Sequence, residues 1–421
     1  MLSVRELFKV GHGPSSSHTI GPMRACRWIL EHFESKGIDH IKIIMYGSFA
    51  LTGKGHLSDK AMKEVFAKYP VEIVWDIKTP TPHPNTMDVL VYDKAGKLLT
   101  NQRFVSVGGG TIEIEGQPKQ ANVYPYKNFY EMKKIIKDKK LTAFQFLCQH
   151  EDKQDLINLF EEMIKSFEDT CADGLSKTGQ IEGLVAFDRR ARTVMDSVKP
   201  TDDEMVKRVK KVAAWGMATN EEAVGYGMVV TAPTCGSAGV MPGAYMWAKE
   251  KYKPTKERIY EALSAASLVG ITVKQNGSVA GATGGCQAEV GVAVALAATM
   301  YSVLAFDSKI DEWEMAAEHG LEQLLGMTCD AVGQCAYVPC IQRNGLYAIK
   351  AIDSAEVAHQ LGDFRSLIYL DDAIAVLKKS GDDLNDGYKE TSKLGLAKHC
   401  KYVLKFRKNI QFDENGNAAK D

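Results

Sequence analysis

The sequence lacks the charge pattern of a protein that binds nucleic acid or an anionic membrane surface. Its 52 lysine and arginine residues are almost balanced by 53 aspartate and glutamate residues, which gives a formal net charge of −1. No basic stripe and no long acidic run interrupts this balance. Because attraction through bulk charge is weak, we expect no nucleic-acid partner and no membrane partner.

The N-terminus lacks the apolar core of a secretory signal, because charged residues are spread through MLSVRELFKVGHG. The longest uncharged apolar run, residues 290–306, is rich in alanine and slightly short to span a bilayer. Glu289 and Asp307 bound this run, which favours a helix buried in a protein core. Together these features predict a cytoplasmic protein.

The cysteines lack the paired spacing of a structural zinc site. In a reducing compartment the nine cysteines should stay free, which favours metal-binding or catalytic roles over disulfides. GMTCDAVGQCAYVPC (326–340) has C-x₅-C-x₄-C spacing, which matches neither zinc knuckles nor the common ferredoxin patterns. A nucleophile would need only one thiol, whereas several thiolates on glycine-rich loops suit an iron–sulfur cluster better. Spacing alone leaves zinc and the cluster open.

The cysteines divide by their surroundings. Five lie on or beside glycine-rich segments: Cys235, Cys286, Cys329, Cys335 and Cys340. Three lie on amphipathic helical segments, where packing is the simpler interpretation: Cys26, Cys148 and Cys171. Cys400, near the polar C-terminal end, fits neither group.

The two halves of the chain differ in their secondary-structure signals, which predicts an α+β protein. The chain of 421 residues exceeds the usual size of one hydrophobic core. Runs with strand character occur at residues 41–47, 71–77 and 89–107. Amphipathic helices are expected at residues 23–37 and 58–69. Residues 94–97 are typical of a hairpin turn, and Ser58 of a helix N-cap.

These elements predict a small N-terminal α/β domain with a mixed sheet over residues 1–140. Beyond it, strand signals almost vanish, and residues 260–306 contain helix-length segments that are apolar on all sides. A polar linker at residues 141–155 should therefore lead to a larger all-α domain, residues 156–421, with buried central helices and a frayed tail.

One glycine-bearing loop in the N-terminal half is unusually rich in hydroxyl groups. GHGPSSSHTIGP (11–22) precedes a helix and carries five adjacent polar residues: Ser15, Ser16, Ser17, His18 and Thr19. One serine would be enough to cap the helix. Four hydroxyl groups and an imidazole beside a helix N-terminus favour binding of a carboxylate or phosphate.

Two further histidines lie on glycine- or proline-bearing connections. His56 ends GSFALTGKGH (47–56), which follows a strand but lacks the spacing of a phosphate-binding P-loop. His83 lies between two prolines in TPTPHPNTM, where turn rigidity explains it nearly as well as a role in a pocket. The VGGGT segment (107–111) would allow close backbone approach or form a plain turn.

Seven segments, in consistent order from about residue 3 to residue 397, closely resemble the iron–sulfur-dependent L-serine dehydratases. These are bacterial L-serine ammonia-lyases that join a β domain and an α domain in one chain. The segments are GPSSSHTIGPMRA, GSFALTGKGH, HPNTM, NEEAVGYGMVVTAPTCGSAGVMPG, GCQAEVG, GMTCDAVGQCAYVPCIQRN and YKETSKLGLA. No single motif carries the resemblance, which covers nearly the whole chain.

The resemblance implies that the α domain is catalytic and holds a [4Fe–4S] cluster through Cys286, Cys329 and Cys340. Three protein ligands would leave one iron open to the hydroxyl group of L-serine, as a Lewis acid. The product would be an aminoacrylate, which hydrolyses to pyruvate and ammonia.

The resemblance also implies that L-serine binds between the two domains, with His56 as the base that removes the Cα proton. The SSSHT loop would hold the substrate carboxylate. From the HPNTM segment, His83 and Asn85 join the predicted substrate-binding residues.

The sequence departs from the family pattern at several cysteines. Relatives usually have Asn at the position of Cys235, Gly-Gly at residues 333–334, and no cysteine at the position of Cys335. Cys235, Cys335 or Cys400 could occupy the fourth iron at rest, although simple packing is favoured for each.

Alternative functions follow from these departures. The chain could be a related lyase acting on threonine or cysteine, or a catalytically silent amino-acid or redox sensor. A pyridoxal-phosphate enzyme is disfavoured, because Lys274 in TVKQNG is a weak candidate for the Schiff-base lysine. A homodimer is the expected assembly if the protein self-associates.

Overall fold

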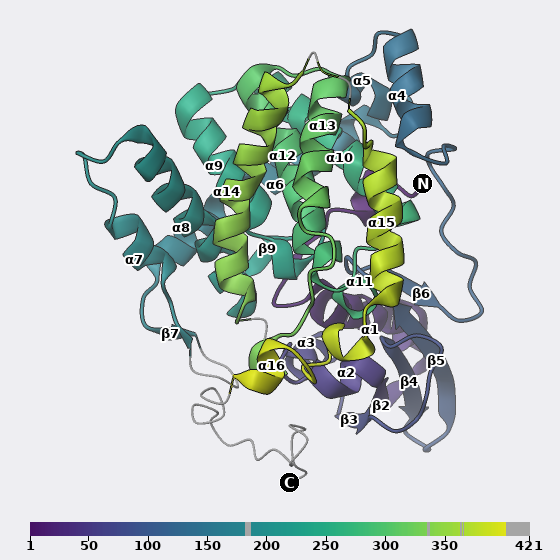
Figure 1. The fold of residues 1–421 in the computed structure, drawn as a ribbon. Helices are drawn as coiled ribbons and strands as arrows, with labels where there is room; N and C mark the ends of the chain where they lie inside the picture. Colours follow the sequence, from purple (N-terminus) through teal and green to yellow (C-terminus); the bar gives the residue numbers. More distant parts are fainter. Residues whose placement is uncertain (182–186, 335–336, 363, 365, 401–421) are drawn as a thin grey trace.

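The structure is a computed structural model that describes residues 1–181, 187–334, 337–362, 364 and 366–400. A small sheet with its helices lies at one end of a larger group of long helices (Figure 1). The predicted α+β class, with a small mixed sheet in the N-terminal part and helices beyond it, is confirmed.

Five strands form the N-terminal sheet in the order β3-β2-β4-β5-β6. Their bounds are β2 Ile38–Tyr46, β3 Val71–Asp76, β4 Thr86–Asp93, β5 Leu98–Ser106 and β6 Ile112–Ile114. Strands β2 and β3 are parallel and the other pairs are antiparallel, so the sheet is mixed. On β2, the alternating residues Ile41, Ile43 and Met45 are buried, as the period-2 pattern of a half-buried strand requires.

Short helical elements precede the sheet strands or alternate with them along the chain. They are η1 Val4–Glu6, the π-helical turn η2 Ser16–Ile20, α1 Gly21–Phe33, η3 Glu34–Lys36, α2 Gly47–Thr52 and α3 Ser58–Val65. Cys26 and Ile29 of α1 and Met62 of α3 share one hydrophobic cluster with the strands. The prediction that Ser58 caps α3 is wrong: Ser58 is the first helical residue, and its hydroxyl donates to the His18 carbonyl at 2.5 Å.

The helical region follows. Its elements are α4 Phe129–Asp138, α5 Ala143–Leu147, α6 Lys153–Ser176, β7 Gln180–Ile181, β8 Phe187–Asp188, α7 Ala191–Asp196, α8 Glu204–Val224, β9 Met228–Val230, η4 Cys235–Ser237, α9 Val240–Tyr252, α10 Lys256–Asn276, α11 Gly281–Gly284, η5 Cys286–Ala288, α12 Val290–Phe306, α13 Ile310–Glu322, η6 Val332–Gln334, α14 Cys340–Gln360, α15 Leu370–Asp383, η7 Asp386–Tyr388 and α16 Leu396–His399.

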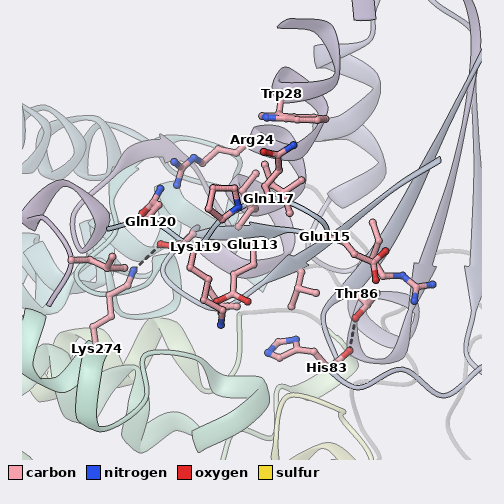
Figure 2. A pocket seen from close by; sticks show the side chains of 18 of the residues that line it. Arg24, Trp28, His83, Thr86, Glu113, Glu115, Gln117, Lys119, Gln120 and Lys274 are labelled. Atoms are coloured by element: carbon pink, nitrogen blue, oxygen red, sulfur yellow. Dashed lines mark hydrogen bonds and ion pairs between the residues drawn. The ribbon is translucent and has the colours of Figure 1, made fainter. Parts of the chain in front are cut away.

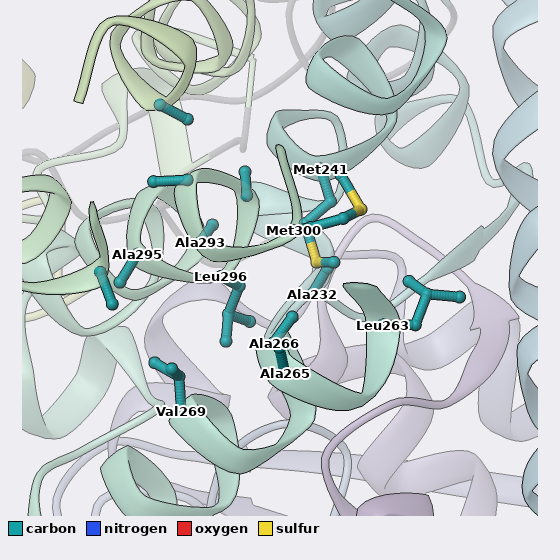
Figure 3. Close-up of a cluster of buried hydrophobic side chains, with 14 of the residues drawn as sticks. Ala232, Met241, Leu263, Ala265, Ala266, Val269, Ala293, Ala295, Leu296 and Met300 are labelled. Atoms are coloured by element: carbon teal, nitrogen blue, oxygen red, sulfur yellow. The ribbon is translucent and has the colours of Figure 1, made fainter. Parts of the chain in front are cut away.

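Helix α12 occupies the centre of this region. Helices α9, α10, α13 and α14 pack around it, and Figure 3 shows small and branched side chains filling the contact, among them Ala293, Leu296 and Met300. The segment Cys286–Phe306 is long and apolar enough to cross a membrane by length and composition, but 83% of its apolar window is buried. Burial on all sides identifies it as the core helix that the sequence predicted.

The N-terminus is part of the helical core. Met1, Val4, Leu7 and Phe8 are buried in the same cluster as α12, and strand β1, Val10–His12, pairs antiparallel with β9. Helices α4 and α5 also contribute buried side chains to this cluster. The division into domains 1–140 and 156–421 with a linker at 141–155 stays a prediction.

Candidate active site

The loop predicted to bind an anion folds into a closed hydrogen-bonded turn. Ser15 caps η2, since its Oγ accepts from the backbone N–H of His18 at 3.1 Å. Ser17 Oγ lies 2.9 Å from His18 Nδ1, and Thr19 Oγ1 donates to the carbonyl oxygen of His56 at 2.8 Å. All five residues from Ser15 to Thr19 are buried. The turn therefore orients His18 and positions the backbone of His56.

His18 and His56 lie side by side, with ring centroids 4.8 Å apart. His18 Nε2 also lies within hydrogen-bond distance of Ser48 Oγ (3.2 Å) and Thr52 Oγ1 (3.1 Å), both on α2. Burial lowers the pKa of His56 to about 4, and burial followed by the neighbouring His56 lowers the pKa of His18. Both imidazoles are therefore neutral near pH 7, and a neutral imidazole can accept a proton.

Glu390 connects the two histidines, and the sequence analysis assigned it no role although it lies in YKETSKLGLA. Its Oε1 is 3.6 Å from His18 Nδ1 and 4.0 Å from His56 Nε2. Its backbone N–H donates to the carbonyl of Cys329 at 2.9 Å, which ties the histidine pair to a cysteine loop. Burial, followed by the charge of Glu289, raises the pKa of Glu390 well above its ordinary value.

Three cysteines converge beside this group. Cys286 begins η5, Cys340 begins α14, and Cys329 lies on the loop between α13 and η6. The thiols are close enough that Cys286 and Cys340 both raise the pKa of Cys329, after the larger effects of burial and of Glu289 and Glu390. Arg343, one turn into α14, is a cation that interacts with all three.

The donor set fits an iron–sulfur cluster. The three thiols are soft ligands, and burial keeps the pKa of each above its ordinary value, so the uncharged form is favoured without a metal. Glycine also leaves space beside them, because a Cβ at Gly281 would lie 3.3 Å from Cys329 Sγ and 2.6 Å from a carboxylate oxygen of Glu289. A separate N/O donor set adjoins it, since ligand atoms of His18, His56 and Glu390 all lie within 4.8 Å of one another.

Asn85 and His83 occupy different surroundings. The Asn85 side chain is fully buried, and neither its Oδ1 nor its Nδ2 finds a hydrogen-bond partner among the described residues. His56 Nδ1 and Ser106 Oγ are unpartnered in the same sense. Buried polar atoms left in this way are costly unless a ligand or water satisfies them. His83 instead accepts a hydrogen bond from the Asn85 N–H at 3.0 Å and lines a separate cavity.

Comparison with known proteins identifies the family. The model of the serine dehydratase alpha chain matches residues 92–397, and that of the serine dehydratase beta chain matches residues 3–64. The chain belongs to the serine dehydratase family. The L-serine dehydratase of Streptomyces coelicolor is 30% identical, over 94% of this chain and 98% of its own length.

Two further relatives are similarly close. The L-serine dehydratase of Helicobacter pylori is 30% identical, over 95% of this chain and 99% of its own length. L-serine dehydratase 2 of Escherichia coli is 31% identical, with 94% of this chain and 98% of its own length covered. Serine dehydratases of this family generally depend on an iron–sulfur centre.

The additional cysteines of the chain differ in position. Cys235 is buried, and the charge of Glu289 raises its pKa after the larger effect of burial, so it lies near the carboxylate that Cys329 contacts. Cys400 follows α16 and is partly buried. Cys335 lies outside the described residues. A role of Cys235, Cys335 or Cys400 at a fourth iron stays a prediction.

Proposed function

We propose that this protein is an L-serine dehydratase, a carbon–nitrogen lyase that converts L-serine to pyruvate and ammonia with a [4Fe–4S] cluster held by Cys286, Cys329 and Cys340. The observation that carries the proposal is the convergence of three thiols, those of Cys286 and Cys329 buried and that of Cys340 half-buried, with two neutral histidines through Glu390. The names of the relatives support L-serine as the substrate.

His56 is the base in this proposal. Its Nε2 faces Glu390, whereas its Nδ1 has no partner among the described residues. A tautomer with the proton on Nε2 leaves the Nδ1 lone pair free to accept the Cα proton of the substrate. General base catalysis of this kind contributes a factor of about 10²–10⁴ to the rate.

The remaining residues bind and orient the substrate. The SSSHT turn and the Asn85 amide would hold the carboxylate, because both offer donors in a buried site. Bound at the three thiolates, the cluster supplies a Lewis acid for the departing hydroxyl group. Glu390 is a positioning residue, since it lies between the two imidazoles and is tied to the backbone of Cys329.

The proposal also includes the localisation, the partners and the assembly of the protein. The balanced net charge and the burial of the long apolar helix α12 support a cytoplasmic enzyme without a nucleic-acid or membrane partner. A homodimer, and preference for L-serine over threonine or cysteine, stay predictions.

Iron and sulfide analysis of anaerobically purified protein, with its absorption spectrum and pyruvate formation from L-serine, tests the proposal. We expect about four irons and four sulfides per chain, with activity lost in air and recovered on anaerobic addition of iron. His56→Ala should lower turnover about 10²–10⁴-fold and keep the cluster absorption. Activity that survives destruction of the cluster would contradict the mechanism, and an aldimine spectrum would support pyridoxal phosphate instead.

A further inference from the structure

A large cavity lies apart from His18, His56 and the three converging cysteines. Its volume is about 960 Å³, and its walls come from α1, strands β5 and β6, the segment after β6 and the end of α10. Figure 2 shows Arg24, Gln120 and Lys274 along one side and His83 and Thr86 away from them. Among the residues that the structure describes, neither His56 nor any cysteine lines it. The proposed reaction therefore leaves this cavity without a role.

Three basic side chains meet around Glu6 at the edge of the cavity, two at its carboxylate and one at its backbone carbonyl. Lys9 Nζ lies 3.2 Å from Glu6 Oε2, and Arg24 lies 3.5 Å from both oxygens of the same carboxylate. Lys274 Nζ donates to the Glu6 carbonyl at 2.5 Å and to Thr111 Oγ1 at 2.7 Å. The positive groups therefore outnumber the carboxylate that they surround.

Burial affects the basic groups of this cluster unequally. Burial, followed by the charge of Lys274, lowers the pKa of Lys9 well below its ordinary value, whereas burial lowers the pKa of Lys274 only to about 8. Although burial opposes it, Lys9 and Arg24 lower the pKa of Glu6 to about 2. Near pH 7 the charges of Arg24 and Lys274 thus face one ionised Glu6. Partly buried charge of this kind is costly without a counter-ion.

Of the basic side chains that line the cavity, Arg24 and Lys274 keep donors for a ligand. An ammonium group has three N–H bonds, and Lys274 uses two of them with Glu6 and Thr111. A guanidinium group has five, and Arg24 uses three of them with Glu6 and the Gly110 carbonyl, which leaves its Nε–H and one terminal N–H. Each of the two cations therefore keeps at least one N–H for an anionic group.

The glycine loop that the sequence analysis left unexplained shapes this edge. Gly108, Gly109 and Gly110 all have positive φ, at 99°, 57° and 74°, a conformation that favours glycine. A Cβ at Gly109 would lie 3.7 Å from Lys274 Nζ and 3.3 Å from the carbonyl oxygen of Pro233. Glycine at these positions keeps the backbone beside the lysine free of side chains.

We propose that this cavity is a second ligand site, which binds a small monocarboxylate through Arg24 and Lys274. A carboxylate group has two oxygens, which match N–H donors from two separate cations. The cavity exceeds a carboxylate group in size, and amide side chains such as Gln117 and Gln120 on its walls suit a ligand with a polar body.

The test is calorimetric titration of L-lactate, lactamide and inorganic phosphate into the anaerobically prepared full chain. We expect L-lactate to bind, lactamide to fail because it has no charge, and phosphate to bind more weakly than L-lactate. Lys274→Met should weaken L-lactate binding at least about tenfold. Lys119→Met is the matched control, because Lys119 lines the same cavity but pairs with Glu113 at 2.9 Å. The affinity of the Lys119→Met variant for L-lactate should stay within about twofold of that of the wild type.

The His56→Ala variant distinguishes this site from the proposed active site. It should still bind L-lactate, and adding Lys274→Met to it should weaken that binding. Arg24→Gln, at a side chain that is 30% exposed, replaces Lys274→Met if that variant fails to fold. Equal L-lactate affinity in the wild type and Lys274→Met would overturn the proposal, as would loss of binding in His56→Ala or tighter binding of phosphate. Turnover of L-serine, measured on the same samples, reports separately on the proposed function.

Discussion

Two buried polar regions lie where the N-terminal sheet meets the helices. They differ in the sign of the ionisable groups around them, and so in the charge of the ligand that would compensate those groups. Around Cys286, Cys329 and Cys340, the neighbouring ionisable groups are carboxyls, with Arg343 as a cation. Around Glu6, the neighbours are Lys9, Arg24 and Lys274. The first region suits a positively charged metal centre and the second suits an anion, because buried charge is tolerated only when it is compensated.

One glycine loop borders both regions. Gly108 and Gly109 lie close to Lys274 and to the loops that lead to Cys235 and Cys286. A Cβ at Gly108 would lie 2.8 Å from the Val279 carbonyl oxygen, so this loop packs closely against the backbone that leads to Cys286.

The largest effect is expected from Cys329→Ser. Loss of one of three thiolate ligands should lower iron binding and turnover by at least about 100-fold. Iron content and pyruvate formation measure this effect, and L-lactate binding through Lys274 should persist. Cys148→Ser is the matched control, because this partly buried thiol lies beyond α5 and outside the converging set. A normal iron content in Cys329→Ser would remove Cys329 from the ligand set.

A smaller effect is expected at Glu390. Glu390→Ala should free both imidazoles and lower kcat about 100-fold, since small displacements of a base cost that much. Glu390→Gln keeps an oxygen and a similar size and should recover most of the loss. The cluster absorption should be unchanged in both variants. Equal activity of Glu390→Ala and the wild type would show that Glu390 does not position the histidines.

The smallest effect is expected on the pH dependence of the free energy of unfolding. The two regions should change it in different pH ranges. Burial lowers the pKa of His56 from 6.5 to about 4. Between these values the unfolded chain binds more protons, so the free energy of unfolding should decrease as pH falls from 6.5 to 4. Burial lowers the pKa of Lys274 from 10.5 to about 8, so the free energy of unfolding should increase as pH rises from 8 to 10.5.

Each window is worth at most about 3 kcal/mol. Denaturant unfolding of the wild type, His56→Asn and Lys274→Met across pH 5–10 measures both slopes. His56→Asn should reduce the slope of the acid window alone, where His18 still contributes, and Lys274→Met should reduce that of the alkaline window alone, where Lys9 still contributes. If either variant flattened both windows, the two regions would be coupled rather than separate.

Much of the fold could be predicted from local patterns. The runs with strand character at residues 41–47, 71–77 and 89–107 predicted β2, β3, β4 and β5. The predicted turn at residues 94–97 is present, since the Asp93 N–H donates to the Lys97 carbonyl at 3.0 Å. The short strand β6, Ile112–Ile114, was missed because three residues carry no clear period. The cap at Ser58 was wrong because a tertiary partner, the His18 carbonyl, takes its hydroxyl.

The sequence by itself determined the α+β class, the buried central helix and the family, because periodicity, composition and ordered motifs are properties of the chain. Only the tertiary structure decided that Glu390 reaches His18 and His56, and that Lys9, Arg24 and Lys274 meet around Glu6. These partners are up to 372 positions apart in the sequence, as with His18 and Glu390 (390 − 18). No local pattern encodes such a distance, because packing of the whole chain brings the groups together.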